Sequence, residues 1–154
     1  MRRILLAVDD TKGSVKAAEL LAGWATTLKP EEVLVMHVQR MFGRSLVGEA
    51  LESDVDIEEI ATALEGSEYQ EKLDNRSRKV LSYFSKMLED AGYSGVRPLV
   101  KQGHPAEQIL ATAQEEEVDL IVVGSRGKRL HSLLLGSVSR EVANTSELPV
   151  LVVR

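Results

Sequence analysis

Residues 119–138 read DLIVVGSRGKRLHSLLLGSV, and this stretch decides how the rest of the chain is interpreted. The apolar run 119–123 is typical of a buried strand. It leads into a loop with two early glycines, three cations and a third glycine at 136, where a new helix is expected. Glycines let the backbone approach a ligand closely, and the first amides of a helix have no partners within it. The stretch therefore predicts an α/β protein that presents amides and positive charge to a phosphate.

The same alternation of strand and helix extends over most of the chain. Strands are expected at 3–8, 32–38, 96–100, 119–123 and 149–153, and helices at 14–28, 68–91, 105–117 and 137–147. Buried strands that alternate with helices form a parallel sheet covered on both faces. We therefore predict an α/β fold with a five-stranded parallel open sheet of the Rossmann-like type, in a single domain over residues 1–154.

The predicted topology also indicates where a ligand binds. In open parallel sheets, ligands lie outside the carboxyl ends of the strands, where the winding direction reverses. The first expected strand ends at Asp9 and the fourth ends at Gly124. If these two strands are neighbours, the loops that follow them face one crevice.

Residues 40–66 do not fit the alternation. Glycines interrupt the segment, and residues 49–65 include seven acids and no base. The apolar residues between Ile57 and Leu64 have the spacing of one short amphipathic helix. We interpret 40–66 as a flexible excursion within the domain. The simplest interpretation of its acids is a solvated face. The alternative is a functional one, in which the segment covers the crevice or contacts a partner.

Composition excludes several classes of function. Nineteen Lys and Arg against 24 Asp and Glu give 19 − 24 = −5, so the chain is not suited to nucleic acid or to an anionic membrane surface. The absence of cysteine excludes disulfides, thiolate metal ligands and thiol catalysis. No apolar run approaches the roughly 18 to 20 residues that span a bilayer, and Ile4–Val8 is too short for a signal-peptide core. We expect a cytoplasmic protein with no membrane or nucleic-acid partner.

The glycine loop matches neither of two common phosphate-binding motifs. No glycine stands five residues before Gly127 and Arg129 replaces the Ser or Thr of a P-loop, while the glycines are too widely spaced for a dinucleotide fingerprint. The loop reads Gly124-x2-Gly127-x8-Gly136-Ser137. Further blocks are Ile4-Leu-Leu-Ala-Val-Asp9, Leu34-Val-Met-His-Val38, Gly103-His-Pro105, Asp119-Leu-Ile-Val-Val-Gly124 and Leu148-Pro-Val-Leu-Val-Val153.

These ordered blocks resemble the universal stress protein family, whose nucleotide-binding members carry Gly-x2-Gly-x9-Gly-Ser/Thr after the fourth strand. The second gap is one residue shorter in this chain. The resemblance covers nearly everything outside 40–66 and implies a fold like that of the adenine nucleotide alpha hydrolases. It also implies binding of ATP, or of AMP or ADP, with any Mg²⁺ held mainly by the phosphates.

The resemblance further implies a set of contact residues. Asp9 would face the nucleoside, and Ala7, Val8 and Val38 would border the adenine pocket. The ribose and phosphates would contact Gly124, Gly127, Gly136, Ser137 and Val138. We add Arg126 and Lys128 as phosphate ligands on their charge alone. Asp10 stands where a glycine is common, so its carboxylate would repel phosphate if it points inward.

Other interpretations of single residues stay open. One alternative is that Asp9 only caps the helix that follows it. Another is that the basic loop is a solvated turn without a ligand. We expect His37, inside an apolar strand, to be a hydrogen-bonded core residue. His104 suits a loop role better than a place at the crevice, and His131 suits solvent as well as phosphate. The three histidines have no metal-ligand spacing, so no protein metal site is expected.

The last expected strand, 149–153, is apolar on both faces. An unprotected apolar strand at a sheet edge invites association, and the family resemblance also implies a homodimer through the C-terminal strand.

The leading hypothesis for the function is an adenine-nucleotide-binding module in stress response or signalling. The alternatives are a weak ATPase or nucleotidyl-transfer enzyme and a dimeric interaction protein without nucleotide. No general base with an orienting partner is evident, so we assign no catalytic residue and expect slow ATP hydrolysis at most.

Overall fold

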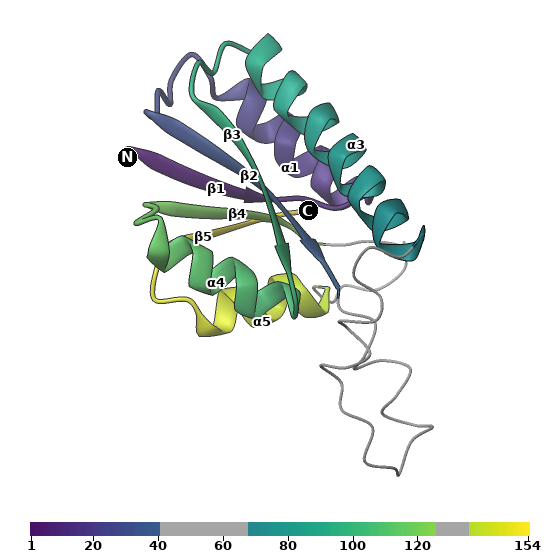
Figure 1. Cartoon of the computed structure of the whole chain (residues 1–154). Helices are drawn as coiled ribbons and strands as arrows, with labels where there is room; N and C mark the ends of the chain where they lie inside the picture. The colour runs from purple at the N-terminus through teal and green to yellow at the C-terminus, as the bar shows by residue number, and fades with distance from the viewer. Residues whose placement is uncertain (41–67, 126–135) are drawn as a thin grey trace.

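The computed structural model describes residues 1–40, 68–125 and 136–154, and within them the chain forms one five-stranded sheet. The strands are β1 (Arg3–Ala7), β2 (Glu32–Gln39), β3 (Val96–Gln102), β4 (Leu120–Gly124) and β5 (Val150–Val153). All pairs are parallel, and the order across the sheet is β3-β2-β1-β4-β5 (Figure 1). The predicted α/β fold with five parallel strands is therefore confirmed.

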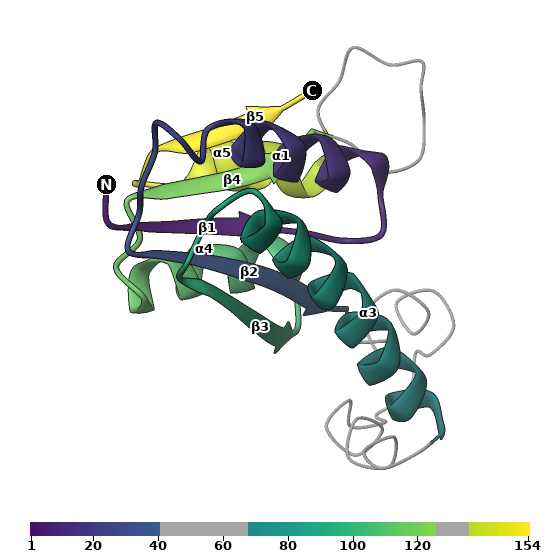
Figure 2. The same cartoon turned by 90° about the horizontal axis from the view of Figure 1, so that it is seen from above.

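Two layers of helices cover the sheet. The helices are α1 (Lys12–Gly23), α3 (Glu68–Asp90), α4 (Pro105–Glu115) and α5 (Ser137–Thr145). Figure 1 and Figure 2 show α1 and α3 on one face and α4 and α5 on the other. Each face has its own core: Ile4, Leu6, Val33 and Val35 pack with α1 and α3, whereas Leu5, Leu34 and Met36 pack with α4 and α5.

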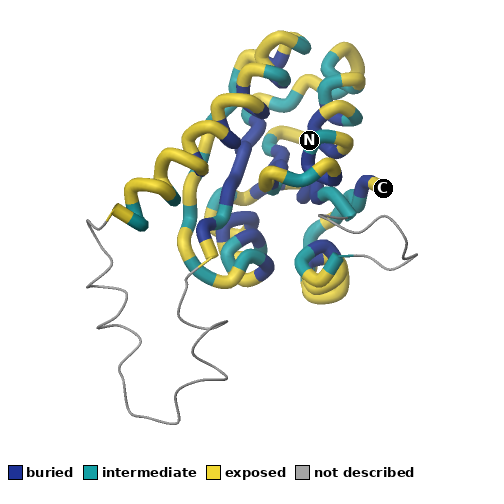
Figure 3. The backbone as a smooth tube through the Cα atoms, turned by 90° about the vertical axis from the view of Figure 1, so that its right-hand side faces the viewer, coloured by how far each residue is buried: buried dark blue, intermediate teal, exposed yellow. Residues whose placement is uncertain are grey.

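The central strands are buried on both sides, as their continuous apolar sequences predict. Leu5, Leu34 and Ile121, from three adjacent strands, are fully buried. The outward faces of the helices are exposed, and the burial changes along α3 with the helical period (Figure 3). None of the helices in the described ranges is both long and apolar enough to cross a membrane.

Several predicted boundaries need correction. The first helix was expected over 14–28 but spans Lys12–Gly23. The amides of Trp24 and Ala25 bond to carbonyls only three residues back, so the helix tightens into turns before Pro30 is reached. The third helix ends at Glu115 instead of 117, because Glu117 takes a positive φ of 50°. The last helix ends at Thr145 instead of 147.

Other boundaries agree with the sequence. The long helix ends at Asp90, and Gly92 follows with a φ of 108°, as expected for a helix-terminating glycine. The third strand contains Pro98 and runs two residues further than predicted, to Gln102. Within the described part of the chain it is an edge strand that pairs with β2 alone, which is where proline is tolerated in a sheet.

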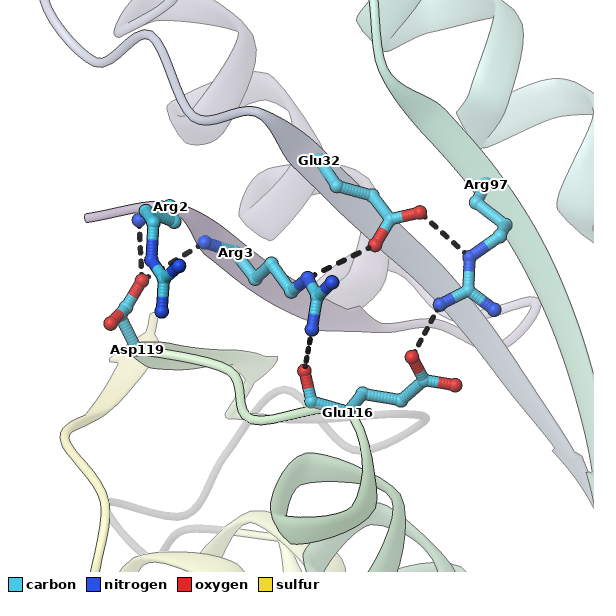
Figure 4. A network of polar contacts seen from close by, with 6 residues as sticks. All are labelled: Arg2, Arg3, Glu32, Arg97, Glu116 and Asp119. Carbon is cyan, nitrogen blue, oxygen red and sulfur yellow. Dashed lines mark hydrogen bonds and ion pairs between the residues drawn. The ribbon is translucent and has the colours of Figure 1, made fainter.

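A network of charged residues fixes the amino end of the sheet (Figure 4). Glu32 in β2 lies between two guanidinium groups, 3.5 Å from Arg3 Nε and 2.8 Å from Arg97 Nε. Arg97 also reaches the Glu116 carboxylate at 2.6 Å. Hydrogen bonds from Arg97 hold the pKa of Glu116 below its ordinary value, and the two carboxylates, Glu32 first, raise the pKa of Arg97.

Asp119 performs a similar role at the entry to β4. Its Oδ2 accepts hydrogen bonds from the backbone N–H groups of Arg2 and of Arg3, the latter at 2.9 Å. These backbone bonds, that of Arg3 first, lower the pKa of Asp119. The amino ends of β1 and β4 are therefore tied together, opposite the edge at which a ligand is expected.

Candidate functional site

The carboxyl ends of β1 and β4 meet at the switch point of the sheet. The two strands are direct neighbours, with Ala7 in register with Val123. From β1 the chain winds toward β2 and β3, and from β4 it winds toward β5. The loops after Ala7 and Gly124 therefore leave from one edge, which confirms the condition placed on the predicted crevice.

Asp9 lies in the loop after β1 and is held by the start of α1. Its Oδ1 accepts hydrogen bonds from the Thr11 N–H at 3.0 Å, from the Thr11 hydroxyl and from the Ser14 hydroxyl at 2.8 Å. The Asp9 N–H in turn donates to Ser14 Oγ at 2.9 Å. The other oxygen, Oδ2, has no hydrogen-bond partner among the described residues, and the residue is exposed. Asp9 thus braces the turn into α1 with one oxygen and leaves the other available.

Gly124 is required by close contact between β4 and α1. A Cβ on Gly124 would lie 2.3 Å from the carbonyl carbon of Gly13 and 2.4 Å from its oxygen. No side chain fits between the two backbones, so the first turn of α1 lies directly against the end of β4. Gly124 is therefore explained by packing, and the packing places the α1 terminus beside the glycine loop.

The two ends of the glycine loop are closed by backbone hydrogen bonds. The Ser125 N–H donates to the Val153 carbonyl at 2.7 Å, and the Gly136 N–H donates to the Ser125 carbonyl at 2.6 Å. Ser139 Oγ donates to the Gly136 carbonyl at 3.1 Å. Gly136 was predicted to contact phosphate, but its amide is already engaged in closing the loop. Its contribution is to start α5 at a fixed place.

The first turn of α5 has hydrogen-bond donors that no described residue satisfies. The Arg140 N–H makes the first intrahelical bond, to the Gly136 carbonyl at 3.0 Å. The N–H groups of Ser137, Val138 and Ser139 therefore have no acceptor within the helix, and no side chain caps it. Ser137 is exposed, so its hydroxyl adds a further donor at this end. This donor set suits a phosphate.

Apolar residues lie on the α4 and α5 side of the same edge. Ala7, Val38 and Val138 are all partly buried against that core. Val8, by contrast, packs into the core of the opposite face. Its N–H donates to the Met36 carbonyl at 2.8 Å, and its carbonyl accepts from His37 Nδ1 at 2.9 Å. Val8 was predicted to border the adenine pocket; its N–H, its carbonyl and its side chain contact other parts of the protein, and a nucleotide contact at Val8 stays a prediction.

His37 is the hydrogen-bonded core residue that the sequence predicts. It is only 8% exposed, and because a carbonyl can only accept, its Nδ1 carries the proton in the bond to Val8. His104 occupies the cap position before α4, with Nε2 3.8 Å from Glu141 Oε2 on α5. In the described ranges, no three acidic or histidine side chains gather as metal ligands would.

Asp10 is turned toward α3 by an ion pair. Its Oδ2 contacts the guanidinium of Arg76, and both side chains are about half exposed. The carboxylate that would have repelled phosphate is therefore paired with a cation from the helix over β2. Sequence reasoning gave no signal for this pairing, because the two residues are 66 positions apart.

The rest of the predicted site lies outside the described residues. Arg126, Gly127, Lys128 and His131 belong to 126–135, and the excursion 40–66 is described only at Arg40. Two residues of the edge were not predicted: Ser14, which holds Asp9, and Gly13, which contacts Gly124. The small residues of the Gly13-Ser14 pair, next to an expected helix start, were the available signal.

Comparisons with known proteins agree with this arrangement. The sequence matches the model of the universal stress protein family over residues 1–154. It is 35% identical over 131 residues to universal stress protein MJ0577 of Methanocaldococcus jannaschii, which covers 83% of this chain and 80% of that protein. Universal stress protein YxiE of Bacillus subtilis is 33% identical, over 99% of this chain and 98% of its own.

Solved structures give the same result. The structure of MJ0577 superposes with a TM-score of 0.76 at 30% identity, over 99% of this chain and 94% of that one. The universal stress protein from Archaeoglobus fulgidus in complex with dAMP superposes with a TM-score of 0.63 at 22% identity, over 100% of this chain and 98% of that one. At that identity the likeness concerns the fold.

Proposed function

The chain belongs to the universal stress protein family, and on this premise we propose that it binds ATP or another adenine nucleotide as a dimeric module in stress response or signalling. The observation that carries the proposal is the first turn of α5, whose amides have no acceptor among the described residues, beside the carboxyl ends of β1 and β4. The chain is acidic overall, with a net charge of −5, so an anion needs such a local donor set in order to bind.

The phosphates would bind at the start of α5. The amides of Ser137, Val138 and Ser139 point out of the first turn, and the helix dipole favours negative charge there. Arg126, Gly127 and Lys128 belong to the proposed phosphate site through their place in the loop. The contact between Gly124 and Gly13 supports this assignment, because it keeps the α1 terminus next to the loop.

The nucleoside would bind over the ends of β1 and β2. Asp9 Oδ2 is available to accept from a ribose hydroxyl, since Oδ1 is already held by Thr11 and Ser14. Ala7 and Val38 are partly buried on the α4 and α5 side, and they would border the adenine. Any Mg²⁺ would be held mainly by the phosphates, as is usual for this ion.

The dimer would form through β5. The Ile121 N–H donates to the Pro149 carbonyl, and the Ser125 N–H donates to the Val153 carbonyl. Because backbone groups alternate in direction along a parallel strand, Val150 and Val152 turn both their N–H and C=O groups to the free edge. Their side chains are half-buried. A second copy of β5, related by a two-fold axis, would pair with these groups.

Hydrolysis would be slow at most. The carboxylates at the described edge are Asp9 and Asp10. One oxygen of Asp9 is bonded three times, and Asp10 is paired with Arg76. Because Asp9 and Asp10 already serve these structural contacts, we assign neither as a general base. The proposal also includes a cytoplasmic location, which cell fractionation would test.

A thermal-shift titration tests the proposal. Purified protein is heated with ATP, ADP or AMP, with and without Mg²⁺, and nucleotide is separately extracted from denatured protein. A ligand at 100 times its Kd stabilises a protein by about 2.7 kcal/mol, which raises the Tm of a chain of this size by about 5 °C or more. No shift with any adenine nucleotide, and no nucleotide in the extract, would contradict the proposal.

A further inference from the structure

A groove of about 500 Å³ runs between α3 and the edge strand β3, on the opposite side of β2 from the β1–β4 switch point. Its floor is apolar and consists of Leu81, Pro98 and Val100. Its wall is one stripe of α3 at helical spacing: Asp74, Arg78, Ser82, Ser85 and Glu89. Val100 is 41% exposed although it is a large aliphatic residue in a strand. The groove is therefore an apolar strip with a polar border, beside a strand that has no second neighbour among residues 1–40, 68–125 and 136–154.

The backbone of β3 offers hydrogen-bonding groups along this groove. The Val33 N–H donates to the Gly95 carbonyl at 2.6 Å, and the Gly103 N–H donates to the Gln39 carbonyl at 3.0 Å. Alternation along the strand then directs residues 95, 97, 99, 101 and 103 toward β2. Val96, Val100 and Gln102 direct their N–H and C=O groups to the free edge, whereas Pro98 directs only a carbonyl there.

A buried hydroxyl in the groove has no partner. Ser85 on α3 is 9% exposed, and its Oγ makes no hydrogen bond to any part of the chain that the structure describes. Buried hydroxyls in folded proteins are nearly always bonded. The Ser85 side chain lines the groove, but its Oγ is covered by the protein itself, so Ser85 shapes the wall and offers no hydrogen bond to an occupant.

The two ends of the groove differ in charge. Gln39 donates to Asp74 and to Ser77 on α3, and it accepts from Gln102 on β3. The amino half of α3 therefore lies at the carboxyl end of β3, where Arg78 and Asp74 carry opposite charges. Glu89 lies four helical turns after Asp74 on α3, toward the amino end of β3. With two acids and one base in the wall, the groove favours a cation near Glu89.

We propose that this groove binds an extended segment of another protein, which adds to β3 as a strand and directs a Lys or Arg side chain to Glu89. The free edge supplies main-chain hydrogen bonds, as in other cases of strand addition. Small aliphatic side chains of the segment cover Pro98 and Val100. Pro98 has no N–H, so the ladder of main-chain hydrogen bonds lacks one bond at that position. Side-chain contacts are therefore needed as well, and they select which segments pair with the edge.

The probe is a library of random peptides displayed on phage and selected against the full chain. Selected peptides are synthesised, and their affinities are measured by fluorescence anisotropy. We expect alternating aliphatic positions with one Lys or Arg. Failure to enrich any such peptide would overturn the proposal.

Matched variants locate the bound peptide. Val100→Pro removes an outward N–H without touching the ladder to β2, and we expect about a tenfold loss of affinity, as for one good hydrogen bond. Val100→Thr keeps that N–H and should retain the affinity. Glu89→Lys should lower the affinity by a similar factor through repulsion. Equal affinity for all of these variants and the wild type would overturn the proposal.

Ser85→Ala is the control in the groove wall. Because the Ser85 hydroxyl is covered and makes no hydrogen bond to the described residues, the substitution should leave the Tm unchanged or raise it and should leave the peptide affinity unchanged. Amide hydrogen exchange completes the test: the Val100 N–H should gain protection in the complex, and the Val152 N–H should not. Protection at Val152 alone would place the peptide on β5 and overturn the proposal. If the protein forms a dimer that Val100→Pro disrupts, the occupant of the groove is a second copy of this chain, and the proposal is overturned.

Discussion

Gly124 at the end of β4 contacts Gly13 in the first turn of α1 so closely that a Cβ on Gly124 would lie 2.3 Å from the Gly13 carbonyl carbon. We predict that Gly124→Ala destabilises the protein by about 1–3 kcal/mol, the usual cost of inserting a methyl group into a filled space. The substitution forces α1 away from β4. Urea unfolding of wild type and variant measures the difference.

The control for this prediction is Gly23→Ala at the other end of α1. A Cβ there meets nothing within 4 Å, and alanine restricts the unfolded chain more than glycine does. Gly23→Ala should therefore be neutral or should stabilise by up to about 1 kcal/mol. Equal effects of the two substitutions would show that the contact between the glycines is not tight.

The ion pair between Arg76 and Asp10 is predicted to protect the nucleotide site from a second carboxylate. Arg76→Ala leaves Asp10 uncompensated, and we expect adenine-nucleotide affinity to fall about two- to fivefold at low salt. Adding Asp10→Asn to that variant should restore the affinity, because it removes the uncompensated charge. Isothermal titration of the wild type, the two single variants and the double variant tests this. A double variant as weak as Arg76→Ala would contradict the electrostatic explanation.

Asp119 is predicted to contribute stability that is lost in acid. Backbone hydrogen bonds from Arg3 and Arg2 lower its pKa in the folded state. Its contribution is therefore present above the unfolded value of about 3.9 and disappears as the pH falls through the folded value. Asp119→Asn should be less stable than the wild type at pH 7, and the difference should shrink toward pH 2.

Urea unfolding over that pH range provides the measurement. Asp90→Asn is the comparison, because Asp90 belongs to an exposed pair with Lys86 on α3. Such pairs contribute about 0.5 kcal/mol or less. A constant difference between Asp119→Asn and wild type at every pH would show that the charge of Asp119 is unimportant.

The outward N–H of Val152 is predicted to hold the proposed dimer together. Val152→Pro removes that donor at the free edge of β5, while the bonds from Ile121 and Ser125 to β5 carbonyls remain possible. Sedimentation should show a dimeric wild type and a variant that dissociates at the same concentration. Val152→Thr, which keeps the N–H, serves as the control. A monomeric wild type, or a variant as dimeric as the wild type, would contradict pairing through β5.

The fold was predictable because its determinants are local. Runs such as 4–8 and 120–123 are apolar enough to be buried on both faces, and amphipathic helices separate them. The helix ends were less accurate. Apolar spacing continues from Gly23 to Leu28, whereas the backbone changes there to tighter hydrogen bonds, and side-chain periodicity does not report that change.

The candidate site was only partly predictable. Asp9 and Ser137 could be predicted as site candidates because they lie next to an expected strand end and an expected helix start, and their contact with a nucleotide stays a prediction. The contact of Gly13 with Gly124 and the pairing of Asp10 with Arg76 depend on how distant segments meet. The direction of the Val8 side chain, into the core of the α1 and α3 face, was also not evident from its position beside Asp9. A nucleotide contact at Val8 stays a prediction.

The most direct measurement is an ATP titration followed in amide-resolved NMR spectra. The proposed binding mode predicts that the N–H resonances of Ser137, Val138 and Ser139 shift together with that of Asp9, while those of Val96 and Val100 on β3 do not. Spectra in which saturating ATP leaves the first turn of α5 unchanged would contradict the account.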